Sequence, residues 1–254
     1  MGTQFEGRTA LVTGAGRGIG RELARQLAAG GARVAVLARS HAELTETARQ
    51  VRVDGGRAHV VLADLADAGQ RAEALRQVRE AYDAVDILVN NAGVVAPLEP
   101  SAELDPADWA AAVELNLTAA AALTFALLPA MLDRGWGRVV NVSSGVVAQP
   151  GFLVGGNAYV TSKAALEAHT LNLAAELAGT GVTANVYRPG SVDTAMQAAI
   201  RGTDPARLGA GLRDHFARTH ERGELLTPAA SARSMLARLG GDGTGQIWHV
   251  ADPT

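Results

Sequence analysis

A tyrosine and a lysine stand four residues apart in the stretch A-Y-V-T-S-K-A, as Tyr159 and Lys163, and Lys163 is the only lysine beside 22 arginines. Residues four apart on a helix share one face. A phenol has an ordinary pKa of about 10, and a nearby cation favours its ionised form. An ammonium is compact and has three donors, unlike a planar guanidinium. The pair therefore predicts proton transfer at Tyr159 assisted by Lys163; the alternative is two unrelated neighbours.

A glycine-rich stretch, T-G-A-G-R-G-I-G at residues 13–20, lies between the first predicted strand and the first predicted helix. Small residues let the backbone approach a pyrophosphate that rests on a helix N-terminus. Its glycine spacing differs from G-x-G-x-x-G, and a plain glycine-rich turn is the alternative. The position between strand and helix favours a dinucleotide site. Its expected contacts are Gly14, Arg17, Gly18, Ile19 and Gly20.

The end of the second predicted strand indicates which dinucleotide. NAD sites usually place an acid about 20 residues beyond the glycines to hold the ribose 2′-hydroxyl. Here the sequence reads Leu37-Ala38-Arg39-Ser40. Arg39 and Arg17 suit a 2′-phosphate, so we expect NADP(H) and regard NAD(H) as less favoured, although both could be ordinary surface arginines. Asp64, after the third strand, could accept a hydrogen bond from the adenine amino group, with Leu65 beside it.

The elements that must position these residues alternate along the chain. Continuous apolar runs such as T-A-L-V-T and D-I-L-V-N are typical of strands buried on both faces of a parallel sheet. Strand and helix in turn predict a doubly wound (Rossmann) α/β fold of about seven parallel strands with helices on both faces. The predicted strands are Thr9–Thr13, Arg33–Leu37, Ala58–Ala63, Asp86–Asn90, Arg138–Ser143, Thr183–Arg188 and Gln246–Val250.

Helices are expected near 18–30, 41–54, 67–83, 105–133, 157–179 and 227–239. No linker divides the chain, so we expect a single domain over 1–254. The stretch 191–226 lacks a clear pattern and is long for a connection, which predicts a substrate-binding loop or lid.

Composition excludes several other classes. A net charge of −3 gives no footprint for nucleic acid, and the absence of cysteine together with six scattered histidines predicts no metal site. The start M-G-T-Q-F-E does not resemble a signal peptide. The apolar run Leu117–Leu132 is interrupted and short for a bilayer, so we expect a buried helix, no membrane association and a cytoplasmic protein.

Six motifs together resemble the short-chain dehydrogenase/reductase family, in order and over nearly the whole chain. They are the glycine stretch, N-N-A-G at 90–93, E-L-N-L at 114–117, N-V-S-S at 141–144, Y-V-T-S-K at 159–163 and R-P-G at 188–190. Four of them follow predicted strands, so they meet at the carboxyl edge where such sheets bind ligands.

The resemblance implies a role for each site residue. Tyr159 exchanges a proton with the substrate oxygen, Ser144 hydrogen-bonds that oxygen, Lys163 lowers the pKa of the tyrosine and holds the nicotinamide ribose, and Asn116 positions a water. Ser143 competes with Ser144 for the serine role; the family pattern favours Ser144, with Ser143 bonding backbone. Further cofactor contacts are implied at Asn91, Ala92, Gly93, Tyr159, Lys163, Pro189, Gly190, Val192 and Thr194.

The implied function is an NADP(H)-dependent oxidoreductase that transfers a hydride between the nicotinamide and a carbonyl or secondary alcohol substrate. The alternative is a cofactor-binding sensor or scaffold that keeps the fold without turnover, but such a protein should lack one of Asn116, Ser144, Tyr159 and Lys163, and all four are present. The alanine-rich helices around 110–128 and 158–178 have apolar outer faces. In this family such faces form subunit contacts, which implies a homotetramer or homodimer.

Overall fold

The computed structural model describes residues 4–208 and 210–252. Its centre is a sheet of seven parallel strands in the order β3-β2-β1-β4-β5-β6-β7. This confirms the predicted fold class, and each strand lies within one residue of its predicted bounds. The strands are β1 (Thr9–Thr13), β2 (Arg33–Ala38), β3 (Arg57–Leu62), β4 (Ile87–Asn90), β5 (Gly137–Val142), β6 (Val182–Arg188) and β7 (Ile247–His249).

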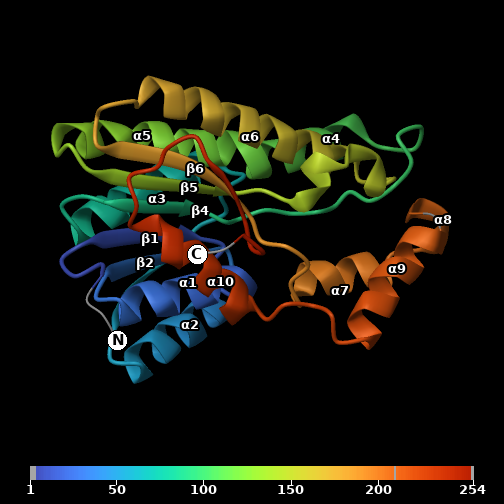
Figure 1. Cartoon of the computed structure of the whole chain (residues 1–254), viewed down its shortest axis with the longest axis horizontal. Coiled ribbons are helices and arrows are strands. Elements are labelled where there is room, and N and C mark those ends of the chain that lie inside the picture. The colour runs from blue at the N-terminus through green and yellow to red at the C-terminus, as the bar shows by residue number, and fades with distance from the viewer. Residues whose placement is uncertain (1–3, 209, 253–254) are drawn as a thin grey trace.

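Helices cover both faces of the sheet, as Figure 1 shows. On one face, α1 (Gly18–Ala29), α2 (His41–Val53) and α10 (Pro228–Leu239) share a buried apolar cluster with β1 and β2. On the other face, α3 (Ala68–Ala81), α5 (Ala119–Asp133) and α6 (Asn157–Glu176) share a second cluster. Because both faces are covered, the strands are apolar without alternation, as the sequence pattern required.

The predicted helix 105–133 is divided in three. It consists of α4 (Pro106–Val113), the π-helical turn η1 (Glu114–Thr118) and α5. π-helical turns often occur at functional sites, and this one contains Asn116. By length and mean hydropathy (1.8) the run Pro106–Asp133 could cross a membrane, but α5 packs on the sheet through Leu123, Leu127 and Met131, which are buried.

The stretch 191–226 is largely helical rather than irregular. It contains α7 (Ala195–Gly202), α8 (Pro205–Leu208) and α9 (Ala210–Glu221), which project from the body in Figure 1. These three helices are called the lid below. Ile200, Leu208 and Phe216 bury their side chains in a third cluster that also contains Leu153 and Tyr159. The lid therefore packs beside the predicted catalytic tyrosine.

Candidate active site

A cleft of about 390 Å³ lies at the carboxyl ends of the strands. Most residues expected to contact a cofactor line it, whereas Gly20, Asn116, Ser144, Gly190 and Val192 do not. The lining residues among those expected are Gly14, Arg17, Gly18, Ile19, Arg39, Asp64, Leu65, Asn91, Ala92, Gly93, Tyr159, Lys163, Pro189 and Thr194.

The glycine stretch forms the turn between β1 and α1. Gly14 and Gly18 have φ of 63° and 55°, in the left-handed region that favours glycine. A Cβ on Gly20 would lie 2.3 Å from the carbonyl oxygen of Gly14, so the helix begins in close contact with the loop. No side chain caps the N-terminus of α1 at Arg17. Its first N–H groups are thus available to an anion, which fits a pyrophosphate.

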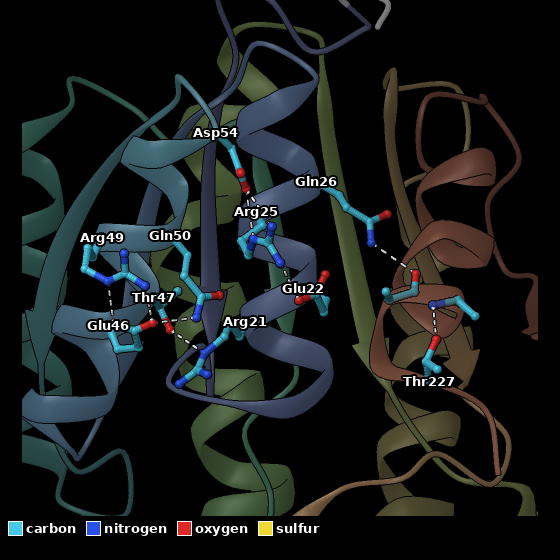
Figure 2. Close-up of polar contacts among 12 residues, drawn as sticks. Arg21, Glu22, Arg25, Gln26, Glu46, Thr47, Arg49, Gln50, Asp54 and Thr227 are labelled. Atoms are coloured by element: carbon cyan, nitrogen blue, oxygen red, sulfur yellow. Dashed lines mark hydrogen bonds and ion pairs between the residues drawn. The ribbon is translucent and has the colours of Figure 1, made fainter. Parts of the chain in front are cut away.

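Three side chains outside the glycine stretch hold it in shape. Thr47 of α2 donates to the carbonyl of Ala15 at 2.9 Å, and Arg21 donates to that of Gly16 at 2.5 Å. Arg21 also bonds Thr47 at 3.1 Å, which Figure 2 shows between α1 and α2. From the end of β4, Asn91 donates to the carbonyl of Thr13 at 2.9 Å. Arg21 and Thr47 were missed from the sequence, because nothing in the pattern of a helix face indicates a long-range contact.

The end of the cleft beside β2 and β3, called the adenosine end below, carries solvated charges. Arg39 is exposed, and Arg17 lies 3.4 Å from the carboxylate of Glu43, with most of its own side chain exposed. Glu43 was also missed. It stands three residues after Ser40, which caps α2 by accepting from the N–H of Glu43, so its position in the sequence signals a helix start. A carboxylate therefore does lie at the adenosine end, but it comes from Glu43 of α2 and not from the end of β2, where residue 38 is alanine.

Asp64 follows β3 at the same end. Its carboxylate accepts from the N–H of Ala66 at 2.9 Å, and its own N–H donates to Gln70 at 2.9 Å. These bonds hold Asp64 and Leu65 on the cleft wall, where a purine base would lie against Leu65.

The opposite end, called the nicotinamide end below, is buried and contains Tyr159 and Lys163. Lys163 is 3% exposed; its Nζ donates to the carbonyl of Val142 at 2.8 Å and lies 6.0 Å from the centroid of the Tyr159 ring. Burial lowers the pKa of Lys163 to about 8. The two remaining donors of this ammonium suit a ribose diol.

The pKa of Tyr159 is raised by its burial, and a hydrogen bond with Ser144 opposes this shift only in part. Burial of the phenol is therefore the dominant influence on its pKa, and the expected lowering of that pKa by Lys163 stays a prediction. Ser144 lies outside the lining of the cleft; its hydroxyl accepts from the N–H of Val146 at 3.4 Å and acts on Tyr159 by lowering the pKa of the phenol in part. That both hydroxyls contact the substrate oxygen stays a prediction.

Asn116 bonds two neighbouring segments through its side chain. Its Oδ1 accepts from the N–H of Val94 at 2.8 Å, and its Nδ2 donates to the carbonyl of Val94 at 2.9 Å and to Ser162 at 3.0 Å. A Cβ on Gly93 would lie 3.0 Å from Oδ1 and 3.4 Å from Nζ of Lys163. The amide thus holds the Gly93–Val94 backbone against Lys163. That Asn116 positions a water stays a prediction.

Ser143 differs as well. Its hydroxyl donates to the carboxylate of Glu167 at 2.6 Å, so the expectation that it bonds backbone is wrong. Glu167, a buried acid of α6, lies opposite the end of β5, and nothing in the sequence indicates that contact.

Comparison with known proteins places this geometry in a family. Residues 8–205 match the model of the short chain dehydrogenase family. A short chain dehydrogenase of Pseudocercospora fijiensis is 39% identical over 198 residues, which cover 77% of this chain and 63% of that relative. The 3-oxoacyl-[acyl-carrier-protein] reductase of Escherichia coli is 36% identical over 208 residues, covering 81% of each.

Solved structures agree over nearly the whole chain. A variant of the actinorhodin polyketide ketoreductase with NADPH has a TM-score of 0.86 at 36% identity and covers 98% of this chain and 97% of its own. A protein of Beutenbergia cavernae, assigned as an NAD(P)-dependent gluconate 5-dehydrogenase and holding NADP at low occupancy, has a TM-score of 0.85 at 35% identity, with the same coverage.

Proposed function

This chain belongs to the short chain dehydrogenase family, and we propose that it is an NADP(H)-dependent oxidoreductase that interconverts a carbonyl compound and its secondary alcohol. The observation that carries the proposal is the buried side chain of Tyr159 beside the buried ammonium of Lys163, with Ser144 close enough to lower the pKa of the phenol. An oxygen placed against both hydroxyls receives a proton from one and a hydrogen bond from the other. The bound cofactor supplies or accepts the hydride.

Each residue has a distinct task in this account. Tyr159 donates the proton to the carbonyl oxygen during reduction, and Ser144 stabilises the charge that develops there. Lys163, which donates to the carbonyl of Val142, would hold the nicotinamide ribose with its other donors and stabilise the phenolate that remains. Asn116 keeps the Gly93–Val94 backbone in register with Lys163.

NADP(H) is proposed as the cofactor. Arg17 and Arg39 supply two cations at the adenosine end of the cleft, where a 2′-phosphate would lie. Both solved structures above were obtained with NADP or NADPH.

Reduction is the direction that the site favours at neutral pH. Burial raises the pKa of Tyr159, so the phenol keeps its proton and acts as an acid. The rate of reduction should fall as pH rises through the ionisation of the Tyr159–Lys163 pair, and the rate of alcohol oxidation should rise over the same range.

The substrate is proposed to be a small molecule with an apolar body. The wall beyond Tyr159 consists of Val94, Val95, Met196 and Ala199. Two lid arginines face acids of the chain itself: Arg207 lies 3.6 Å from Glu99, and Arg201 lies 4.0 Å from Asp193. We therefore do not assign these arginines to an anionic substrate.

We also propose a cytoplasmic homodimer or homotetramer with no nucleic-acid or membrane partner. Phe125 of α5 is 59% exposed and Leu171 of α6 is 38% exposed, which leaves apolar area on the outer faces of these helices. A monomer by light scattering at micromolar concentration would contradict the assembly, and recovery in a membrane fraction would contradict the location.

A panel of ketones and alcohols tests the proposal, with turnover followed through the absorbance of reduced nicotinamide. We expect turnover of apolar ketones with NADPH and slower turnover with NADH. Binding of NADPH without turnover of any substrate in the panel would favour the sensor or scaffold alternative.

A further inference from the structure

A buried ion pair lies beneath the nicotinamide end. Arg188, the last residue of β6, donates from Nε and Nη2 to the two carboxylate oxygens of Glu167 at 2.8 and 2.7 Å. The two side chains are 10% and 6% exposed. A paired carboxylate and guanidinium with this two-pronged geometry are held rigidly, whereas either charge alone would be costly at this depth.

The pair reaches three segments that carry the site. Ser143, which donates to Glu167 at 2.6 Å, directly precedes Ser144. Glu167 follows Lys163 by four residues on α6, so the two side chains share one helix face. Arg188 directly precedes Pro189, which lines the cleft. The ends of β5, β6 and the active-site face of α6 are thus joined through one carboxylate.

We propose that Glu167 and Arg188 are positioning residues of the reaction: Glu167 fixes Ser143 and thereby Ser144, and Arg188 neutralises Glu167 so that its charge does not act on Tyr159 and Lys163. This inference rests on the proposed function. Without Arg188, a buried carboxylate one helical turn from Lys163 would raise the pKa of Tyr159 further. Without the negative charge of Glu167, an unbalanced guanidinium would lower it.

The other charged groups around Tyr159 and α6 are the same in the unmodified protein and in variants of Glu167 and Arg188. Their contribution to the pKa of Tyr159 is common to all variants and cancels when variants are compared. On α6 itself they are His169 and Glu176, on the elements packed against α6 they are Asp108, Glu114, Arg138 and Tyr187, and on the lid they include Arg201, Arg207, Arg213, Asp214 and His215.

The ionisation of Tyr159 can be measured without turnover. The chain has three tyrosines, and the other two, Tyr82 and Tyr187, are partly or fully buried with a raised pKa. The ultraviolet absorbance of phenolate, taken as the difference from Tyr159→Phe in each background, reports Tyr159 alone. A protein that fails to turn over any ketone would still give this result, so failure of the two proposals can be told apart.

The expected shifts have opposite signs. Glu167→Gln should lower the midpoint of Tyr159 by about one pH unit, because Glu167 stands eight residues from Tyr159 on α6, roughly 12 Å along the helix, in a buried site. Arg188→Met should raise the midpoint by about as much. The double variant should return close to the midpoint of the unmodified protein. The same displacements should appear in the pH dependence of kcat for reduction.

Two further variants separate position from charge. Ser143→Ala should lower kcat by about 10-fold with little change in KM for the ketone and no change in the midpoint, because only the support of Ser144 is lost. Arg188→Lys keeps the charge, so the midpoint should stay while kcat falls. The control is Asp242→Asn, which removes an exposed carboxylate that accepts a 2.7 Å bond from buried Arg138; it should change neither quantity.

Shifts of the same sign in Glu167→Gln and Arg188→Met, or no shift in either, would overturn the proposal. If Arg188→Met does not fold, the sign for Glu167→Gln decides, and an unchanged or raised midpoint in that variant contradicts it. If Asp242→Asn lost as much kcat as the variants of Glu167 and Arg188, the loss would come from general loosening of the fold, and the proposal would be overturned.

Discussion

The two ends of the cleft place charge in opposite surroundings. At the adenosine end Arg17, Glu43 and Arg39 are wholly or partly exposed, and the ion pair between Arg17 and Glu43 is loose, at 3.4 Å. At the nicotinamide end Lys163 and Glu167 are 3% and 5% exposed, and their contacts are 2.8 Å or shorter. Water screens the first set and is excluded from the second. Substitutions at the adenosine end should therefore adjust affinity, and those at the nicotinamide end should remove turnover.

The largest expected effect is that of Lys163→Arg. The charge is retained, but the ammonium lies between the carbonyl of Val142, the backbone of Gly93 and the Tyr159 ring, where a planar guanidinium does not fit. We expect kcat to fall by at least ~100-fold. Arg39→Lys, the reverse exchange at the exposed end, is the control and should change kcat by less than about 2-fold. An active Lys163→Arg enzyme would mean that only charge is needed there.

The contrast between the buried Lys163 and the exposed Arg39 should also appear in the pH dependence of the free energy of unfolding. Burial lowers the pKa of Lys163 from 10.5 to about 8 in the folded chain. Between these values the unfolded chain holds the proton and the folded chain does not, so the protein gains stability as pH rises from about 8 to 10.5. Relative to Lys163→Met, the free energy of unfolding should rise by about 2 kcal/mol over this range.

Denaturant unfolding at several pH values measures this difference, with Arg39→Met as the control at the exposed end. The control should run parallel to the unmodified protein. If the free energy of unfolding of Lys163→Met also ran parallel to that of the unmodified protein against pH, the lowered pKa of buried Lys163 would be contradicted.

A smaller effect is expected from the pair of changes Ala38→Asp and Arg39→Leu. The aspartate repels a 2′-phosphate and accepts from a ribose 2′-hydroxyl, while a cation is lost. The ratio of the dissociation constants for NADPH and NADH should move about 10-fold toward NADH, with kcat nearly unchanged. Tighter binding of NADH than NADPH by the unmodified protein would contradict the proposed cofactor at once.

The smallest effect is expected for Glu43→Gln. Removing this carboxylate frees Arg17 and removes a negative charge near the 2′-phosphate, so NADPH should bind about 3-fold more tightly. Glu46→Gln is the matched control, because Glu46 bonds Arg49 on α2, as Figure 2 shows, and does not line the cleft. Titration with adenosine 2′,5′-bisphosphate checks this without the nicotinamide. If both variants gained the same affinity for NADPH, the gain would come from the change in net charge and not from the position of Glu43.

The sequence predicted the fold well because buried parallel strands are continuous apolar runs, and because glycine and Tyr/Lys patterns are local. The helices of the lid were not predicted. Apolar residues do recur there every four positions, at Met196 and Ile200 and at Leu208, Leu212 and Phe216. Two of the three lid helices, α7 and α8, have only eight and four residues, so their periodic signal covers few turns.

Contacts between distant segments could not be predicted in the same way. The pairing of Glu167 with Arg188 and Ser143, and of Thr47 with the glycine turn, joins elements whose distance in space is set only by the sheet order. The π-helical turn at Asn116 is likewise invisible, since its residues suit an α-helix. The raised pKa of Tyr159 was not predicted, because burial, which raises it, is a property of the fold.

The most direct measurement compares turnover and cofactor affinity in Tyr159→Phe on one preparation. The change removes a proton donor and little surface, so kcat for ketone reduction should fall by at least ~100-fold, while the dissociation constant of NADPH should stay within about 2-fold of the unmodified protein. Near-normal turnover by a folded Tyr159→Phe protein would contradict the account.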